Sequence, residues 1–464
     1  MNHPNPGPAA LIAELNARLP NRVATGEAIR AHHGRYESHF APALPDAVVF
    51  PASTEEVVEI VHLCRKHHTP MIPFGIGSSL EGHVLPTAGG ITLDLSQMNR
   101  VLALHAEDFD VVVQPGVTRK QLNAEIRDSG LFFSVDPGAD ATLGGMAATR
   151  ASGTNAVRYG TMRDNVLATT TVLADGSVIR TGSRARKSSA GYDLTRLLVG
   201  SEGTLGIMTE LTLRLHPQPE ATSAAVCNFR ALADAVRCVI QTIQHGVPVA
   251  RVELIDAVSI RAINAYSKTR LAEAPTLFFE FHGSAGSVDE QATTVQQIAR
   301  EHGGAEFEWA SRTEDRSRLW QARHDTYFAS LQLKPGCRAL TTDVCVPISR
   351  LADCIEATRE DILSHDLVAP IVGHVGDGNF HVIVLIDPNS PAENERAEAF
   401  HERLVRRALA MDGTCTGEHG VGIGKRHFLV AEHGEAAVEA MRAIKRALDP
   451  ENLLNPGKIL PPRD

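Results

Sequence analysis

The spacing of apolar residues changes once along the chain, near residue 216. Before that point, short β-branched runs bounded by Gly, Pro or Asp follow one another closely, which predicts β-strands. Two amphipathic helices are predicted among them, at 54–68, where Ser53 and Glu56 have capping-box spacing, and at 119–130. The first half is therefore expected to be an α+β structure. The predicted strands read PMIPF, GITLDL, VVVQPG, TTTVLADGSVIRTG and GIMTELTLRL.

The segment HPQPEATSA at 216–224 predicts a domain boundary, because two prolines and several polar residues interrupt the periodicity. Beyond it, longer helical patterns alternate with strand patterns, which predicts a second, smaller α+β domain. The tail at 448–462 is punctuated by prolines, and we expect it to pack back on the body. The helical patterns lie at 231–246, 289–304 and 351–366, and the strand patterns lie at 276–283, 368–374 and 380–387.

Length, charge and cysteine content narrow the class of protein. A chain of 464 residues is too long for one core, so two or three domains are expected. The formal net charge of -10, with both signs mixed along the chain, argues against nucleic-acid binding and against an anionic membrane surface. No apolar run approaches the roughly 20 residues that span a bilayer, and the start lacks a secretory-signal pattern. The seven cysteines are never spaced as CxxC, which is typical of reduced residues. We expect a cytoplasmic protein, with peripheral docking on the inner face of the membrane as the other option.

Glycine-rich segments indicate a cofactor, but not a nicotinamide nucleotide. GIGSSLEG has Leu80 where a dinucleotide motif needs a third Gly or Ala, and GVGIGK has His419 where a phosphate loop needs its first Gly. Two further clusters of Gly, Ser and Thr lie at 136–160 and 200–207. Small residues let backbone N–H groups approach a pyrophosphate. Three such loops in one stretch predict a large cofactor that carries phosphate.

Taken in order, these segments resemble a known family. IPFGIGSSLEGH, VQPGV, DPGADATLGGMAAT and LLVGSEGTLGIMTELTL are similar to the FAD-binding domain of the vanillyl-alcohol oxidase type, also called the PCMH type. RSRLWQARHDTY, TDVCVPISRL, IVGHVGDGNFH, GTCTGEHGVGIGKR and LDPENLLNPGK resemble the second half of FAD-linked oxidases, in the branch that oxidises D-lactate. The likeness runs from residue 43 to residue 462, which is nearly the whole chain.

The resemblance implies an α+β fold with three parts. These are a two-part FAD-binding domain, a ferredoxin-like α+β substrate (cap) domain, and a C-terminal helical segment that packs back on the FAD-binding domain. We expect an N-terminal helical segment at 1–42, the FAD-binding domain at 43–219, the substrate domain at 220–410, and a C-terminal segment that completes the active site at 411–464.

The resemblance also implies FAD along the glycine loops. Relatives that hold FAD covalently often anchor it through a His in the first loop, which here continues with Ser78 and Ser79, so we expect non-covalent FAD. Asn455 is similar in position to a residue that reaches the flavin in relatives. The residues expected at the cofactor are Pro73, Gly75, Ile76, Gly77, Ser78, Ser79, Pro137, Gly138, Thr142, Gly144, Gly145, Thr149, Ser152, Gly153, Glu202, Gly206, Ile207 and Asn455.

A metal site is expected in the second half. The runs VAPIVGH and FHVIVLID are joined through Gly-Asp-Gly-Asn, a strong hairpin signal that brings His374 and His381 together. Such a pair alone is more often structural. Glu418, in another Gly-rich turn, offers a carboxylate, and two imidazoles with one carboxylate are common ligands of Zn or Mn. The resemblance implies the same three metal ligands.

The chemistry implied is oxidation of D-lactate or another small D-2-hydroxy acid to the 2-oxo acid, with hydride transfer from Cα to the flavin. A metal acidifies the substrate hydroxyl, and His419 is the expected base. A lone arginine on a helix is more often solvated, but the resemblance implies that Arg323 binds the substrate carboxylate.

Several alternatives stay open. A D-2-hydroxyglutarate dehydrogenase carries a Lys where this chain has Thr341 and Thr342, and a glycolate oxidase FAD subunit would need partner subunits. A metallohydrolase explains the ligands but not the glycine loops, and a non-catalytic flavoprotein electron carrier explains only the loops. The electron acceptor is open among cytochrome c, quinone and a soluble flavoprotein. The oligomeric state is open too, with a homodimer as one option.

Overall fold

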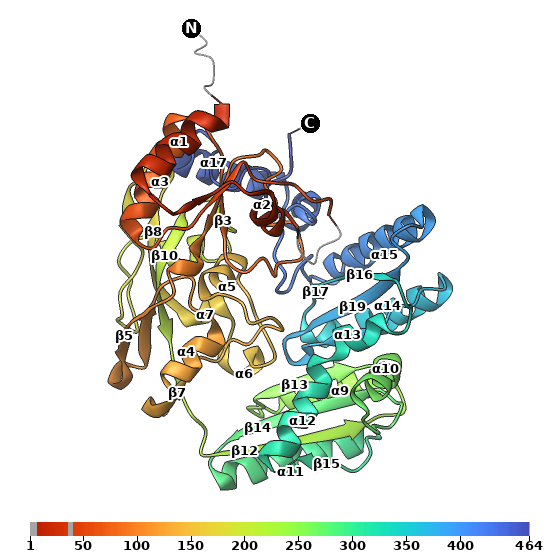
Figure 1. Cartoon of the computed structure of the whole chain (residues 1–464). Helices are drawn as coiled ribbons and strands as arrows, with labels where there is room; N and C mark the ends of the chain where they lie inside the picture. Colours follow the sequence, from red (N-terminus) through yellow and green to blue (C-terminus); the bar gives the residue numbers. More distant parts are fainter. Residues whose placement is uncertain (1–6, 36–39, 311, 464) are drawn as a thin grey trace. The chain divides into compact units, whose positions relative to one another are not determined.

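The computed structural model describes residues 7–35, 40–310 and 312–463 (Figure 1). The other residues, including 1–6 and 36–39 of the expected N-terminal helical segment, lie outside the described chain. Contacts divide the chain into two compact units. The first unit comprises the described residues up to Ser152, then Gly160–Gln218, then those from Glu418 onward, and the second comprises Gly153–Tyr159 and Pro219–Gly417.

The first unit is built on two main sheets. One has the order β1-β2-β4-β3, with β2, β4 and β3 parallel, and the other is antiparallel with the order β5-β6-β10-β8-β9. A two-stranded sheet joins β11 and β7. The strands are β1 (Val23–Ala24), β2 (Ala47–Val49), β3 (Met71–Phe74), β4 (Ile91–Asp94), β5 (Val101–His105), β6 (Asp110–Val113), β7 (Leu131–Phe132), β8 (Val166–Val172), β9 (Val178–Arg180), β10 (Ile207–Arg214) and β11 (His216–Pro217).

The predicted helix at 54–68 is present as α3, with Val57, Ile60, Val61 and Cys64 buried. Ser53 caps α3 by accepting a bond from the Glu56 N–H at 3.2 Å, and the Glu56 carboxylate reaches back to the N–H of Ala52 at 2.7 Å. The capping box is therefore present but reaches one residue further back. The helices are α1 (Gly7–Arg18), α2 (Glu27–Gly34), α3 (Thr54–Lys66), α4 (Arg119–Glu125), α5 (Leu143–Thr149), α7 (Met162–Asn165), α8 (Leu194–Leu198), α16 (Leu429–His433) and α17 (Glu435–Leu448).

The helix predicted at 119–130 is shorter than expected. It ends at Glu125, a 3₁₀ turn follows at Arg127–Ser129, and Gly130 has φ 71°. The left-handed glycine ends the 3₁₀ turn and leads the chain into β7.

The C-terminal tail packs back on the first unit, as predicted. Leu453 and Leu454 are buried in the same apolar core as α1 and α3. The N–H of Met71 donates to the Leu453 carbonyl at 2.7 Å, and the N–H of Asn455 donates to the Met71 carbonyl at 2.8 Å. The tail therefore extends the β3 edge as a short parallel bridge.

The second unit contains an eight-stranded sheet with the order β15-β12-β14-β13-β18-β19-β16, and β17 also pairs with β19. Every residue of β19 is buried, because helices cover both faces of the sheet (Figure 1). The strands are β12 (Ala221–Asn228), β13 (Arg251–Ile255), β14 (Thr276–Gly283), β15 (Glu308–Ala310), β16 (Arg338–Thr341), β17 (Val344–Cys345), β18 (Ile371–Gly373) and β19 (Asn379–Ile386).

One face of this sheet packs on α10, α12 and α13 through a core that includes Ile260, Trp320 and Ala329. The helices of the unit are α6 (Ala156–Tyr159), α9 (Leu232–Gln244), α10 (Ala257–Ser267), α11 (Ala285–Glu301), α12 (Thr313–His324), α13 (Thr326–Leu331), α14 (Leu351–Ser364) and α15 (Pro391–Leu409).

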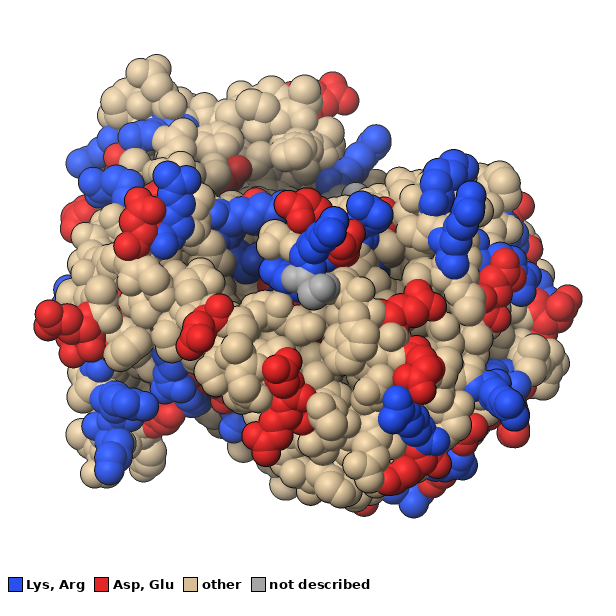
Figure 2. All heavy atoms as spheres, turned by 90° about the horizontal axis from the view of Figure 1, so that it is seen from below, with Lys and Arg blue, Asp and Glu red and all other residues tan. Residues whose placement is uncertain are grey.

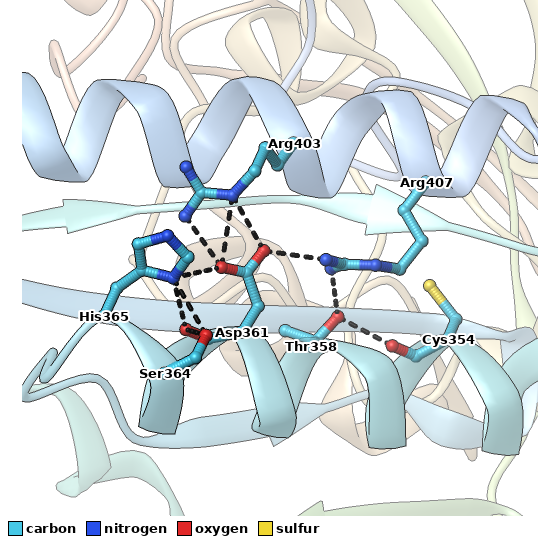
Figure 3. Close-up of polar contacts among 7 residues, drawn as sticks. All are labelled: Cys354, Thr358, Asp361, Ser364, His365, Arg403 and Arg407. Atoms are coloured by element: carbon cyan, nitrogen blue, oxygen red, sulfur yellow. Dashed lines mark hydrogen bonds and ion pairs between the residues drawn. The ribbon is translucent and has the colours of Figure 1, made fainter.

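An ion-pair cluster joins α14 to α15 (Figure 3). Asp361 accepts two bonds from Arg403 Nε, both at 3.1 Å, and bonds from Arg403 Nη2 and Arg407 Nη2, both at 2.7 Å. Arg407 also donates to the hydroxyl of Thr358. Burial by itself raises the pKa of Asp361, but the hydrogen bonds and charges of the two arginines outweigh it and hold this pKa below its ordinary value.

The surface bears both signs of charge. Lysine and arginine side chains are interspersed with aspartate and glutamate over the face seen in Figure 2. In the described part of the chain, no helix is both long and apolar enough to cross a membrane. None of the seven cysteines, all within the described ranges, forms a disulfide bond.

Candidate active site

The first two glycine loops of the first unit are in contact. A Cβ added to Gly75 would lie 2.3 Å from the Thr142 hydroxyl, so only glycine permits this approach. Gly144 is equally restricted, because an added Cβ would come 2.5 Å from Pro115. The N–H of Gly144 donates to the Pro115 carbonyl at 2.8 Å, which fixes the start of α5 beside the first loop.

The third loop, at 200–207, lies against the same elements. Gly203 has φ 71°, and an added Cβ would come 3.0 Å from the ring of Pro73. The N–H of Glu202 donates to the Ala148 carbonyl of α5 at 2.9 Å. Asn455 from the tail donates through Nδ2 to the carbonyls of Glu202 and His83, at 2.7 and 2.9 Å. Four segments that are distant in sequence therefore converge around the end of β3.

Several buried polar atoms at this point have no hydrogen-bond partner among the described residues. They include Oγ of Ser79, Oδ1 of Asn455 and both ring nitrogens of His83. The Asn455 amide is oriented by its two Nδ2 bonds, so Oδ1 faces away from the protein groups that hold it. An added Cβ on Gly138 would meet no atom within 4 Å, so this backbone borders open space. Unsatisfied buried groups beside small residues fit a polar cofactor such as FAD.

The remaining residues expected at the cofactor lie in or next to the three glycine loops in sequence, but they differ in solvent exposure. Ile76 is 43% exposed, whereas Ile207 is 1% exposed and belongs to an apolar core. Gly77 has φ 71°, and the Thr149 hydroxyl donates to the Gly145 carbonyl at 3.2 Å. The others are Ser78, Pro137, Ser152 and Gly206 in the first unit and Gly153 in the second.

The loop that carries His419 is anchored by two carboxylates that sequence reasoning did not assign to this role. Glu202 accepts from the N–H groups of Val421 and Gly422 at 2.7 and 2.9 Å, and His83 lies 3.3 Å from the same carboxylate. Glu81 lies 3.4 Å from Lys425 Nζ, and both side chains are buried. The loop is therefore fixed to the glycine loops of its own unit.

In the second unit the predicted hairpin is present, with a different turn. β18 and β19 are antiparallel, and Val372 pairs with His381. The connection is a 3₁₀ turn at Val375–Asp377, closed by Gly378 at φ 81°. His374 follows the end of β18 and is therefore not opposite His381. The two imidazole rings nevertheless meet edge to face, with centroids 5.4 Å apart.

Both histidines are oriented by their Nδ1 atoms. Nδ1 of His374 donates to Oε1 of Glu253 at 2.8 Å, and Nδ1 of His381 donates to the Thr342 carbonyl at 3.0 Å. Because both acceptors are oxygens without a proton to give, the protons are on Nδ1. In the neutral form of each ring, Nε2 then carries the lone pair that can bind a metal ion.

Glu418 completes a group of metal-ligand type. Single ligand atoms of His374, His381 and Glu418 all lie within 4.8 Å of one another. Glu418 directly follows Gly417, the last residue of the second unit. This donor set, two imidazoles and one carboxylate, fits a divalent cation such as Zn or Mn.

Asp343 accepts hydrogen bonds from two of the segments that carry these ligands. It accepts from Asn379 Nδ2 and from the Thr416 hydroxyl, both at 2.7 Å. Asn379 is two residues before His381, and Thr416 is two residues before Glu418. Gly417 must be glycine, because a Cβ would come 2.1 Å from Asn379 Nδ2. These bonds therefore hold two of the three ligand-bearing segments together.

Arg323 lies at the end of α12 and is paired with a carboxylate that sequence reasoning missed. Its Nε and Nη2 donate to Oε2 of Glu253, at 3.0 and 2.6 Å. Burial by itself raises the pKa of Glu253, but the charges and hydrogen bonds of His374 and Arg323 outweigh it and lower this pKa. A lone carboxylate between the apolar residues Val252 and Leu254 was the available signal, since a buried charge needs partners.

Comparisons with known proteins define the family. Residues 218–459 match the family model described as FAD linked oxidases, C-terminal domain, and residues 45–182 match that described as FAD binding domain. The chain therefore belongs to the FAD-linked oxidases, as the sequence resemblance implied, and it is an FAD-binding oxidoreductase.

Its relatives include D-lactate dehydrogenases, which confirms the likeness to that branch. A probable mitochondrial D-lactate dehydrogenase of Danio rerio is 55% identical over 441 residues, covering 94% of this chain and 89% of the relative. A mitochondrial D-lactate dehydrogenase [cytochrome] of Arabidopsis thaliana is 48% identical, covering 98% and 81%. A glycolate oxidase subunit of Bacillus subtilis is 34% identical, covering 90% and 89%.

Solved structures share the fold. p-Cresol methylhydroxylase with substrate bound has a TM-score of 0.80 at 20% identity, covering 97% of this chain and 96% of its own. 4-Ethylphenol oxidase from Gulosibacter chungangensis has a TM-score of 0.78 at 20% identity, covering 97% of both chains. The predicted vanillyl-alcohol oxidase fold class is confirmed.

Proposed function

We propose that this protein oxidises D-lactate and related small D-2-hydroxy acids to the 2-oxo acids, with FAD as the cofactor and a divalent cation at His374, His381 and Glu418. The observation that carries the proposal is the convergence of these three side chains within 4.8 Å of one another, with both imidazoles oriented through Nδ1. The D-lactate dehydrogenases among the relatives support the choice of substrate.

Residues of the first unit would hold FAD. The glycine loops at 75–79, 138–145 and 202–206 provide backbone without obstructing side chains. Ser79 Oγ and Asn455 Oδ1 offer buried polar atoms that lack protein partners. FAD, when bound, supplies an acceptor for the hydride of the substrate Cα.

Two groups of the second unit would orient the substrate. Arg323 keeps Nη1 free of hydrogen bonds to described residues while Nε and Nη2 are held by Glu253, so one edge of the guanidinium can donate to a carboxylate. Each histidine is held through Nδ1, so Nε2 is the nitrogen that would bind a cation together with Glu418. A divalent cation there would supply Lewis acidity toward the substrate hydroxyl.

His419 would take the hydroxyl proton on an imidazole nitrogen. It follows Glu418 directly, so a base and a ligand are adjacent in the chain. The Glu202 bonds to Val421 and Gly422 hold the same loop and limit its motion. As acceptor of the electrons we propose cytochrome c, because two of the relatives are named D-lactate dehydrogenase [cytochrome].

The test is anaerobic mixing of the purified protein with D-lactate, L-lactate and buffer alone. We expect D-lactate to bleach the visible flavin absorbance, whereas L-lactate should not. Prolonged chelation should stop the bleaching while leaving the flavin spectrum intact, and Mn²⁺ or Zn²⁺ should restore it. Acid precipitation should release all flavin into the supernatant if FAD is non-covalent.

Undiminished bleaching after chelation, with metal loss confirmed by elemental analysis, would contradict the metal role. A colourless protein with hydrolase activity would overturn the whole proposal. Reoxidation of the reduced flavin by added cytochrome c, compared with a soluble quinone, tests the acceptor separately.

A further inference from the structure

Glu253 is a charged residue inside an apolar strand. It lies between Val252 and Leu254 in β13, and its side chain is 1% exposed. Strand alternation puts Arg251, Glu253 and Ile255 on one face of the sheet. Glu253 pairs across to Phe278 of β14, an apolar neighbour, so the strand ladder itself does not explain the charge.

Its two oxygens hold groups from two different elements. Oε2 accepts from Arg323 of α12, and Oε1 accepts from His374, which follows β18. Glu253 lies near His374 because β13 is paired with β18 through Leu254 and Gly373. One carboxylate thus contacts the residue proposed for the substrate carboxylate and a residue proposed for the cation.

The contacts also orient the atoms that would bind the ligands. The bond to Nδ1 fixes the tautomer of His374, with Nε2 as the nitrogen that would bind a metal ion. The two bonds from Arg323 use Nε and Nη2 and fix the plane of the guanidinium. A surface arginine or a freely rotating imidazole would meet neither condition.

We propose that Glu253 is a positioning residue that couples the cation-binding side chain to the substrate-binding side chain. The inference rests on the proposed function and deepens it. Loss of the Glu253 carboxylate then impairs metal affinity and substrate binding together, although Glu253 touches neither ligand directly.

Glu253→Gln is the informative change because it keeps the size of the side chain. The amide oxygen can accept from only one of the two donors, and the amide NH₂ then faces the other donor. We expect the affinity of flavin-loaded, metal-stripped protein for Mn²⁺ to fall by about 10- to 100-fold, as for other groups that orient metal ligands. KM for D-lactate should rise in the same variant, while flavin content stays unchanged.

Glu280→Gln is the matched control. Glu280 lies on the same face of the sheet, in β14, and is also buried. It accepts from His282 at 2.8 Å and lies 3.6 Å from Arg251, and these contacts include neither His374 nor Arg323. This variant should lose thermal stability but keep Mn²⁺ affinity within about threefold, since its partners are not metal ligands.

Free Mn²⁺ can be followed by electron paramagnetic resonance during titration. Wild-type affinity in Glu253→Gln, or an equal loss in Glu280→Gln, would overturn the inference. If Glu253→Gln does not fold, Glu253→Asp keeps the charge and shortens the reach, and it should weaken Mn²⁺ binding in the same direction. Unaltered protein that binds Mn²⁺ but does not oxidise D-lactate overturns the proposed substrate and leaves the metal-affinity result for Glu253 standing.

Discussion

Thr341 is the last residue of β16 and pairs with Ile383 of β19. Paired residues, and residues two apart on a strand, share a sheet face, so Thr341 lies on the same face as His381. A D-2-hydroxyglutarate carries a second carboxylate, which would lose hydration near a neutral threonine without gaining a cation. Thr341 is neutral, so a positive charge for the second carboxylate could come from position 341 only after a substitution such as Thr341→Lys.

We predict that the unaltered protein prefers D-lactate over D-2-hydroxyglutarate by at least about 100-fold in kcat/KM, equivalent to roughly 2.7 kcal/mol. Thr341→Lys should raise activity on D-2-hydroxyglutarate relative to D-lactate. Thr341→Met, which has a similar length but no charge, should not. Steady-state kinetics with both acids decide this, and equal rates in the unaltered protein would refute the substrate preference.

For single residues, the sequence predicted those that lie in a recognisable motif, but it missed the carboxylates that hydrogen-bond to them or to their neighbours. His374, His381 and Glu418 were proposed from local patterns together with the family resemblance, and the structure brings their ligand atoms together. Glu253 and Asp343 were missed because their importance depends on which strands pair, and a single sequence does not reveal strand order. A buried charge in an apolar run signals a partner but does not say which one.

At the scale of elements, the contact between α14 and α15 depends on one carboxylate. Asp361 is bonded to Arg403 and Arg407 from the neighbouring helix (Figure 3). Removing one partner of a buried ion pair leaves the other charges uncompensated. The Arg403 side chain is 37% exposed, so water moderates the loss.

We predict that Asp361→Asn lowers the stability of the second unit by roughly 1–3 kcal/mol near neutral pH. The folded pKa of Asp361 is depressed, so its stabilisation is present above its unfolded pKa of about 4 and is lost as pH falls through the folded pKa. The difference in melting temperature between the variant and the unaltered protein should therefore shrink on acidification.

Calorimetry at several pH values measures this difference. Asp353→Asn in the same helix is the control, because Asp353 is 66% exposed and should change stability by less than about 0.5 kcal/mol. A gap between Asp361→Asn and the unaltered protein that widens at acid pH would contradict the assigned direction of the pKa.

Local signals predicted elements better than they predicted element ends. The N-terminus of α3 was predicted because Ser53 and Glu56 satisfy its first N–H groups locally. The early end of α4 was not, since the chain changes there from an α-helix to a 3₁₀ turn that Gly130 closes. The connection from β18 to β19 was expected through the Gly-Asp-Gly-Asn segment, and it is a 3₁₀ turn that begins one residue earlier, at Val375.

At the scale of the whole molecule, the first unit depends on the end of the chain. Leu453 and Leu454 fill its core, and Asn455 bonds two of its loops. Burying a leucine side chain contributes about 1.5–3 kcal/mol, so the two together amount to roughly 3–6 kcal/mol.

We predict that a chain ending at Leu448 loses bound flavin and melts at a lower temperature. A chain ending at Pro461 should keep both properties, because Arg463 is exposed and forms only a surface pair with Glu439. Flavin absorbance per protein and a thermal melt measure the two effects. Full flavin content in the shorter chain would contradict the role of the tail.

The domain boundary was predicted from the sequence near residue 216, because prolines interrupt the periodicity of apolar residues there. The sequence did not predict that Gly153–Tyr159 belongs to the second unit, since no local pattern distinguishes this segment from its neighbours. The return of the tail was predicted from its prolines and apolar residues, but its pairing with Met71 was not.

This return of the tail affects the order in which the protein is made. The segment Pro219–Gly417 is continuous and follows the short piece at Gly153–Tyr159, so the second unit has all its residues before synthesis ends. The core of the first unit is complete only when Leu453 and Leu454 have been made, and their contact with Met71 closes a loop of several hundred residues. On the ribosome, the second unit can therefore mature first, and the flavin site stays incomplete until residues 453–455 have been made and have emerged.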